Sequence, residues 1–189
     1  MRIPGSYSFN KGLETVQERY APLLKEIEQI IRKIDASICK TKTSKEKTMS
    51  GRLLYSPKVM NDAFRLLFYQ KGWSSQRVTC EYSAEFYVNG YKPKPMGRGA
   101  FRQMDFVKDR LGVEVQFGAY ACVGYDVLAK MPIFHNLGVI DIGVEIVPVK
   151  GFNYKMSTGG SSFEQCVWDL EKRGVSDIDV PVLILGIDK

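Results

Sequence analysis

Three apolar runs in the second half of the chain constrain the fold most strongly. They span 111–117, 139–149 and 180–187, and the last is almost wholly apolar, as expected of a strand buried on both faces. Helical patterns separate them, one over about 120–134 and one that follows the serine pair 161–162. Strands that alternate with helices are joined by right-handed crossovers. This half of the chain therefore predicts an α/β fold with a partly parallel sheet flanked by helices.

The first of these runs also carries polar residues at every second position. Because side chains alternate between the faces of a strand, Val113 and Val115 belong to an apolar face, and Glu114 and Gln116 project from the other. Asp105 precedes them across a polar turn at 108–110, which gives the order Asp-x8-Glu-x-Gln. A hairpin here would place the two carboxylates close together.

Oxygen ligands of this kind suit a hard cation such as Mg²⁺, which takes one or two carboxylates, several waters and a phosphate oxygen. Asp105 and Glu114 are the candidate ligands, and the carbonyl of Val115 is a candidate third. Gln116 cannot act as a general base because its amide does not titrate, but it can orient a water molecule. So short a pattern also occurs by chance on a solvated strand face. The apolar neighbours of Glu114 favour instead an enclosed carboxylate that needs a partner.

Composition narrows the class of protein. The 189 residues predict one domain, residues 1–189, and a net charge of +6 is compatible with a polyanionic partner. No run reaches the roughly 18 apolar residues of a membrane span, and the first residues lack the apolar core of a signal peptide, so we expect no membrane partner and a cytoplasmic location. The four cysteines are widely spaced and the single histidine completes no zinc set, which favours free thiols.

The first part of the chain, residues 1–75, is predicted to be mainly helical. Apolar spacing indicates helices over 21–34 and from Ser56, as the N-cap before a proline, to about residue 70. Between them lies a basic loop, whose cations are Lys40, Lys42, Lys45 and Lys47. On its pattern alone a solvated surface loop is favoured over a loop that contacts phosphates. Residues 77–100 predict a strand or hairpin that leads into an irregular basic loop.

The stretch 113–117, preceded by 105–110, resembles the active-site segment of type II restriction endonucleases of the BglII and BstYI group, within the PD-(D/E)XK superfamily. The resemblance covers most of the chain and is closest to the BstYI branch. Its further supports are Asp35-Ala36, Thr41-Lys42, Ser44-Lys-Glu-Lys-Thr48, Leu54-Tyr-Ser-Pro57, Lys71-Gly-Trp73, Gly143-Val-Glu-Ile146 and Pro181 to Ile187.

The resemblance implies a restriction-endonuclease-like core, a homodimer and Mg²⁺-dependent double-strand cleavage of DNA. The target would be a palindrome that contains GATC, such as purine-GATC-pyrimidine or AGATCT. Residues 76–189 would then hold the catalytic sheet core and the DNA-reading loops. Asp105 and Glu114 would be metal ligands, and Gln116 stands where most such nucleases have lysine.

The resemblance also assigns DNA contacts. Ser157 and Thr158 match a loop that reads bases in relatives, and Gly118 and Ala119 follow the catalytic strand, where relatives place further base contacts. Ala119 replaces a lysine of the BstYI branch, which leaves the outer base pair open. The basic loop becomes a candidate phosphate contact.

A fourth catalytic position falls near Ser75 or Gln76, where the alignment is loose. Two other functions stay open. Because Gln116 replaces the usual lysine, a sequence-specific DNA-binding protein without catalysis is one alternative. A structure-selective repair nuclease on the same core is the other.

Overall fold

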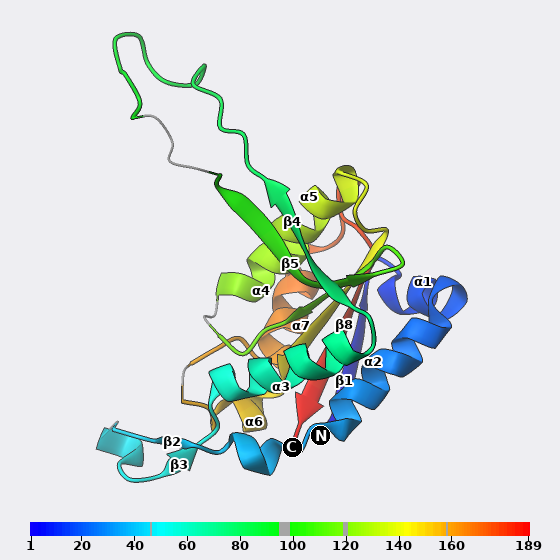
Figure 1. Cartoon of the computed structure of the whole chain (residues 1–189), viewed down its shortest axis with the longest axis vertical. Helices are drawn as coiled ribbons and strands as arrows, with labels where there is room; N and C mark the ends of the chain where they lie inside the picture. Colours follow the sequence, from blue (N-terminus) through cyan, green and yellow to red (C-terminus); the bar gives the residue numbers. More distant parts are fainter. Residues whose placement is uncertain (46, 95–98, 119–120, 158) are drawn as a thin grey trace.

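The computed structural model describes residues 1–45, 47–94, 99–118, 121–157 and 159–189. A six-stranded mixed sheet runs through the protein in the order β1-β8-β7-β6-β5-β4 (Figure 1). Its strands are β1 (Arg2–Phe9), β4 (Ser74–Thr79), β5 (Phe101–Lys108), β6 (Leu111–Val115), β7 (Ile142–Pro148) and β8 (Val182–Asp188). The strands β6, β7 and β8 are parallel to one another, which confirms the partly parallel sheet. The pairs β1–β8, β4–β5 and β5–β6 are antiparallel.

Helices cover both faces of this sheet. They are α1 (Gly12–Arg19), α2 (Ala21–Lys33), α3 (Pro57–Gln70), α4 (Ala121–Tyr125), α5 (Met131–Asn136), α6 (Lys150–Asn153) and α7 (Phe163–Arg173). Short 3-10 helices follow α2 at η1 (Ala36–Cys39) and η2 (Lys47–Met49). The predicted helices over 21–34 and 56–70 are confirmed. The Ser56 hydroxyl accepts a hydrogen bond from the Val59 N–H at the start of α3, and Ser162 caps α7 in a capping box with Gln165.

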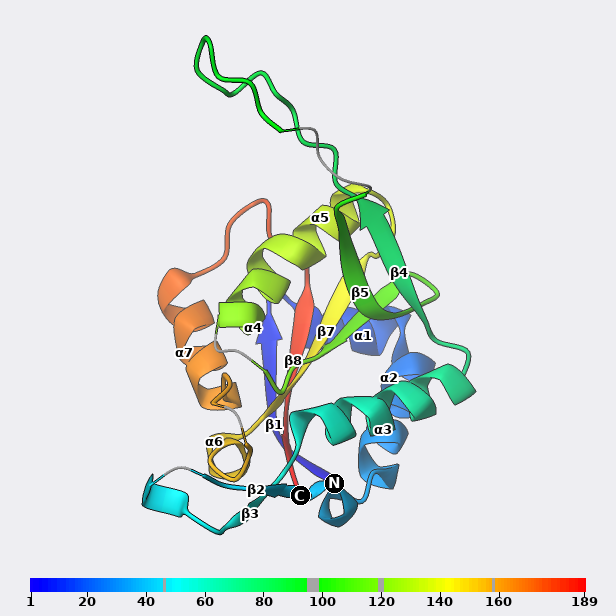
Figure 2. The same cartoon turned by 60° about the vertical axis from the view of Figure 1, so that its left-hand side comes forward.

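Two apolar cores lie on opposite faces of the sheet. The first lies under α2 and α3, where the rings of Phe68 and Phe106 stack with centroids 4.2 Å apart. It includes the apolar face of the run at 111–117, namely Leu111, Val113, Val115 and Phe117. The second core lies under α4, α5 and α7, and includes Val127, Met131 and Phe134. Figure 2 shows α4, α5 and α7 together on one side of the sheet and α2 and α3 on the other.

The crossover from β6 to β7 differs from the single helix expected over 120–134. It consists of α4, a π-helical turn η3 (Asp126–Lys130), and α5. The N–H of Met131 donates to the carbonyl of Asp126, a bond five residues long instead of four. Single π turns inside α-helices occur often at functional sites.

The strand β1 was missed by the sequence patterns. Pro4 and Gly5 disfavour a strand, but β1 lies at an edge of the sheet, where a missing N–H is tolerated. Its register shifts between Arg2 and Gly5, and Gly5 packs against the ring of Phe163. The mainly helical first part of the chain therefore also contributes an edge strand to the sheet.

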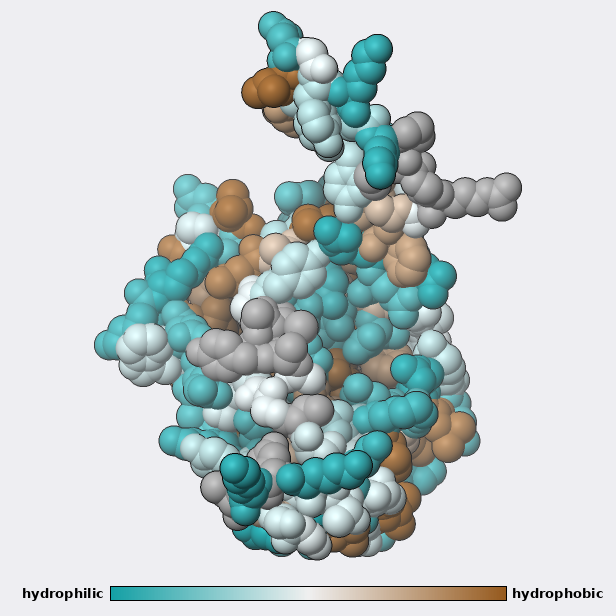
Figure 3. All heavy atoms as spheres, turned by 90° about the vertical axis from the view of Figure 1, so that its left-hand side faces the viewer, coloured by the Kyte–Doolittle hydropathy of each residue, from teal (hydrophilic) through white to brown (hydrophobic). Residues whose placement is uncertain are grey.

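Two extensions leave the body of the protein. Between β4 and β5 the chain forms a long arm that projects away from the sheet, without strand or helix in its described residues (Figure 1). At the opposite end, β2 (Lys42–Thr43) and β3 (Leu53–Leu54) form a small hairpin. Hydrophilic side chains cover much of the face seen in Figure 3, between the arm and the opposite end of the molecule. In the described part of the chain, no helix has the length and apolar character needed to cross a membrane.

Candidate active site

The β5–β6 hairpin brings the two predicted carboxylates together. Phe106 pairs with Val113, so Asp105 and Glu114 occupy adjoining positions on the two strands. The Asp105 N–H donates to Glu114 Oε1 at 3.3 Å, and the Val115 N–H donates to Asp105 Oδ2 at 3.3 Å. The turn between the strands is tight, because Asp109 and Arg110 both adopt positive φ, 47° and 66°. The predicted hairpin and its juxtaposed carboxylates are confirmed.

Glu114 is buried, with 3% of its surface exposed, so the alternative of a solvated strand face is wrong. It projects from β6 toward the second core, opposite the apolar face of the strand. Burial raises its pKa well above the ordinary value, and repulsion from Asp105 adds to the shift. Lys130 opposes this rise in the pKa of Glu114, because its Nζ lies 3.0 Å from Glu114 Oε1. The same Nζ lies 2.6 Å from Asp126 Oδ1.

Sequence reasoning missed both Asp126 and Lys130. Burial alone would lower the pKa of Lys130, but attraction to Glu114 and Asp126 outweighs it and raises that pKa above its ordinary value. The lysine is therefore charged at neutral pH. An i,i+4 pair of an acid and a base in a helical segment was the only signal in the sequence, and such pairs are common on solvated helix faces.

A further acid lies beside this group. Glu145 on β7 pairs in register with Glu114 on β6 and is fully buried. Neither of its carboxylate oxygens has a hydrogen-bond partner among the described residues. Burial, and then repulsion from Asp126 and Glu114, raises its pKa well above the ordinary value. The sequence analysis gave Glu145 no role in the site.

Gln116 lies just past the end of β6 and is partly buried. Its N–H donates to the Ile146 carbonyl at 2.9 Å, and its side-chain Oε1 accepts from the Gly118 N–H at 3.4 Å. The amide oxygen is thereby held, and the NH₂ group is the part of the side chain left to donate. This fits orientation of a water or a phosphate, the role expected for it.

A small polar cavity of about 60 Å³ opens beside Asp105. It is lined by Asn61, Arg65, Tyr69, Gln103, Asp105, Phe106 and Val115. The Oδ1 atom of Asn61 is buried there without a hydrogen bond to a described residue. Asn61 was not predicted as a site residue, since a polar residue on an amphipathic helix carries no special signal.

The two candidates for a fourth catalytic position lie elsewhere on the neighbouring strand. Gln76 on β4 pairs with Met104, and its Nε2 donates to Ser74 Oγ at 3.2 Å. Neither Ser75 nor Gln76 lines the cavity beside Asp105. Their catalytic role stays a prediction.

The carboxylate pair fits a Mg²⁺ ion. No cluster of three or more His, Cys, Asp or Glu that could hold a metal is found in the described ranges. Mg²⁺ does not require one, because it is usually held by one or two carboxylates with water and substrate phosphate. The backbone N–H groups occupy Glu114 Oε1 and Asp105 Oδ2. The other oxygen of each carboxylate has no hydrogen bond to a described residue and remains able to bind a cation.

The segments expected to contact DNA lie together in the structure. Tyr55, next to the β2–β3 hairpin, accepts a hydrogen bond from the Ser157 N–H at 2.9 Å, and its own N–H donates to the Lys155 carbonyl at 2.9 Å. This bridge ties the basic loop to the loop at 155–157. The lysines of the basic loop, Lys40, Lys42, Lys45 and Lys47, are all exposed.

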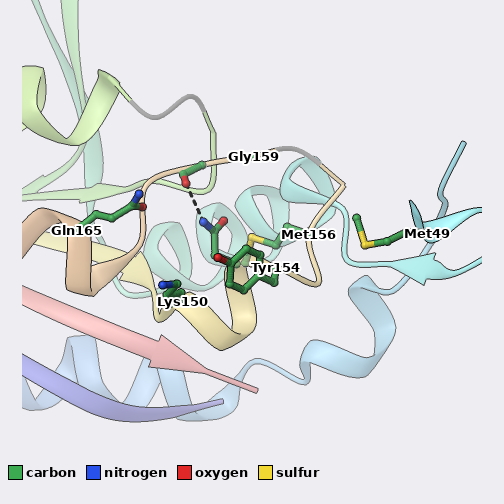
Figure 4. A pocket seen from close by; sticks show the side chains of 8 residues that line it. Met49, Lys150, Tyr154, Met156, Gly159 and Gln165 are labelled. Carbon is green, nitrogen blue, oxygen red and sulfur yellow. Dashed lines mark hydrogen bonds between the residues drawn. The ribbon is translucent and has the colours of Figure 1, made fainter. Parts of the chain in front are cut away.

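Gly160 links the same loop to the end of the catalytic strand. A Cβ atom on Gly160 would lie 2.5 Å from the Gly118 carbonyl, so only glycine permits this approach. A cavity of about 310 Å³ lies beside this contact, lined in part by Lys150, Asn153 and Tyr154 (Figure 4). The predicted contacts at Ala119 and Thr158 lie outside the described residues.

Known proteins resemble this chain in sequence family and in structure. The family model of restriction endonuclease BglII/BglIII matches residues 5–187. Restriction endonuclease BglII complexed with a DNA 16-mer is similar in structure, with a TM-score of 0.72 and 21% identity over 98% of this chain and 76% of that one. Free BglII gives a TM-score of 0.63 and 20% identity over 100% of this chain and 80% of that one. No curated protein matches the sequence significantly.

The mixed sheet flanked by helices is thus the BglII fold, and the predicted fold class is confirmed. The special closeness to BstYI stays a prediction. The match spans nearly the whole chain and includes the hairpin that carries Asp105 and Glu114. The chain therefore belongs to the BglII/BglIII family of restriction endonucleases, which are site-specific deoxyribonucleases.

Proposed function

We propose that this restriction endonuclease cleaves both strands of DNA in a Mg²⁺-dependent reaction, at a palindromic site that contains GATC. The observation that carries the proposal is the Asp105–Glu114 pair, set on adjoining strands with one oxygen of each carboxylate left for a cation. A bound Mg²⁺ would supply charge neutralisation at the phosphate and an acidified water as nucleophile.

The residues of the chain divide the work by their chemistry. Asp105 and Glu114 would bind the metal, with the Val115 carbonyl as a candidate third ligand. The Gln116 NH₂ group would orient the attacking water or a phosphate oxygen by hydrogen bonding. Because Gln116 cannot take up a proton, the proton of the attacking water would leave through the substrate phosphate or the surrounding solvent.

Symmetry and the similarity to a DNA-bound relative support the proposed target and assembly. A palindrome presents the same half-site on each strand, and a two-fold homodimer presents one active site to each. One similar structure is a BglII complex with a DNA 16-mer. The exposed lysines of the basic loop, with Ser157 and Gly118 nearby, would form the surface that meets the duplex. The expected sequence is purine-GATC-pyrimidine or AGATCT, with the BstYI branch as the nearest relative.

Mapping the cut ends on one fully sequenced, unmethylated DNA tests this proposal. Discrete fragments with ends at GATC sites are expected in Mg²⁺ and none in EDTA. Absence of metal-dependent cleavage on DNA rich in GATC sites would reject the proposed reaction. Discrete cuts at unrelated sequences would reject only the recognition site, and cuts confined to branched DNA would indicate a structure-selective nuclease.

Replacement of Glu114 tests whether this carboxylate takes part in DNA cleavage. Glu114→Ala should abolish cleavage and leave binding of GATC-containing duplex, measured in Ca²⁺, largely intact. Glu18→Ala is the control, since Glu18 is an exposed acid on α1. Unchanged cleavage by Glu114→Ala would remove this residue from the mechanism.

A further inference from the structure

Glu114 is held from two sides at a single oxygen atom. Its Oε1 accepts the Asp105 N–H at 3.3 Å and lies 3.0 Å from Lys130 Nζ. A carboxylate oxygen has two lone pairs, so Oε1 has its complement of donors. The carboxylate is then held in place through Oε1, and Oε2 is the oxygen left to bind a metal.

Lys130 is itself fixed by a second acid. Its Nζ lies 2.6 Å from Asp126 Oδ1, and the exposed fraction of its side chain is only 12%. Asp126 is equally enclosed, with 5% of its side chain exposed. An ion pair this deeply buried is not a solvated surface pair of negligible value, because removal of one partner leaves an uncompensated charge.

The backbone around this ion pair places Lys130 close to the sheet. Asp126 and Lys130 are the first and last residues of the π turn η3. Met131, the next residue, packs on Gly143 of β7, where an added Cβ would lie 2.2 Å from the Met131 sulfur. A glycine at this point of β7 therefore lets the helical segment approach the strand that neighbours Glu114.

The neutral residue Gln116 explains why the position of Lys130 beside Glu114 matters. In the position where most nucleases of this superfamily carry lysine, this chain has a neutral amide, and the β6 strand brings no cation of its own. The cation that contacts Glu114 comes instead from another element, the turn η3. We propose that Lys130, braced by Asp126, is a positioning residue that fixes Glu114 for metal binding and serves as the active-site cation of this enzyme. This inference rests on the proposed Mg²⁺ chemistry.

Metal binding to the DNA-free protein tests the inference without reference to cleavage. Residues that hold a metal ligand in place typically contribute 10- to 100-fold to metal affinity or activity. Lys130→Met keeps the length of the side chain and removes its charge. The Mn²⁺ dissociation constant, followed by electron paramagnetic resonance, should rise by about 10- to 100-fold in this variant. The Mg²⁺ concentration for half-maximal cleavage should rise in parallel.

A matched control separates this role from the loss of any buried lysine. Lys108 on β5 pairs with Glu26 of α2 at 2.9 Å, and both side chains are mostly enclosed. Lys108→Met removes a comparable ion pair away from Glu114 and should leave Mn²⁺ affinity unchanged. Affinity for GATC-containing duplex in Ca²⁺ should also stay within about twofold of wild type in Lys130→Met, because only 12% of this side chain is exposed and its charge is already paired with Glu114 and Asp126.

The outcomes are distinct. Folded Lys130→Met that binds Mn²⁺ as tightly as wild type, or more tightly, overturns the inference, since a lysine that only repelled the metal would give tighter binding. If Lys130→Met does not fold, Asp126→Asn decides, because it loosens the lysine and keeps the cation; weakened Mn²⁺ binding supports the inference and unchanged binding overturns it. Wild type that binds Mn²⁺ but cuts no DNA defeats the proposed function and leaves the test of Lys130 readable.

Discussion

Replacement of Glu145 should make the protein more stable. The residue is fully buried, both of its oxygens lack a hydrogen-bond partner among the described residues, and Glu114 lies beside it on β6. Exchange of buried ionic groups for apolar ones of similar volume is often neutral or stabilising, by about 1–4 kcal/mol. Glu145→Met retains most of the side-chain volume. We expect its free energy of unfolding at pH 7 to exceed that of wild type by about 1–4 kcal/mol.

The pH dependence distinguishes the charge from simple packing. Burial raises the pKa of Glu145 in the folded state, so the native protein holds a proton that the unfolded chain releases near its ordinary pKa. Such a group stabilises below the unfolded pKa, and that contribution is lost as pH rises toward the folded pKa. The advantage of Glu145→Met should therefore be smallest near pH 4 and grow by up to about 1.4 kcal/mol per pH unit above it.

Urea unfolding at pH 4.5, 6 and 7.5, followed by tryptophan fluorescence and circular dichroism, measures this. Glu145→Gln is the companion variant, which removes the charge and keeps a polar group, and Glu18→Met is the exposed control, expected within about 0.5 kcal/mol of wild type. A Glu145→Met protein that is less stable than wild type at pH 7.5, or whose advantage does not change with pH, would show that the buried carboxylate has a stabilising partner and refute the reasoning.

Three further changes probe the site and its support. Gly143→Ala should cost about 1–3 kcal/mol in urea unfolding and reduce Mg²⁺-dependent cleavage, because the new Cβ meets the buried Met131 sulfur; an unchanged stability would contradict this packing. Asp141→Asn should lose about 1 kcal/mol at pH 7, since Arg110 lowers the pKa of Asp141 to about 2, and the difference should vanish as acid titrates wild type from pH 4 toward 2. Lys42→Ala should flatten the salt dependence of DNA affinity by about one unit of slope, and an identical slope would remove this lysine from the phosphate contacts.

The hairpin that carries the carboxylates is predictable from the sequence. Alternation from Leu111 to Phe117 sets the faces of β6, and a polar turn close before it fixes how Asp105 returns to Glu114. Both signals are local, since each depends on residues a few positions apart. The parallel strands β7 and β8 follow for the same reason, because their apolar runs leave no other place for them than the middle of a sheet.

The support of the site is not predictable in this way. Lys130 contacts Glu114 only because a π turn and a glycine on another strand bring the helical segment onto the sheet. No residue spacing in the sequence predicts the contact between Lys130 and Glu114. The strand β1 was missed for a different reason, since its Pro4 and Gly5 oppose local strand propensity and only its place at the edge of the sheet permits it.

The face of the sheet that carries Glu114 holds both the charges that the site needs and charges that destabilise the fold. Glu114, Asp126 and Glu145 are buried there, and Lys130 supplies a positive charge in contact with Glu114 and Asp126. A fold selected only for stability would fill this space with apolar side chains, as it does on the opposite face of β6. Glu145 has no hydrogen-bond partner among the described residues, and a divalent cation bound beside Glu114 would relieve the repulsion between these two acids. If that is the use of the cluster, Glu145→Met should gain stability and at the same time weaken Mn²⁺ binding, and a variant that gains stability with unchanged metal affinity would show that Glu145 is a cost without a function in the site.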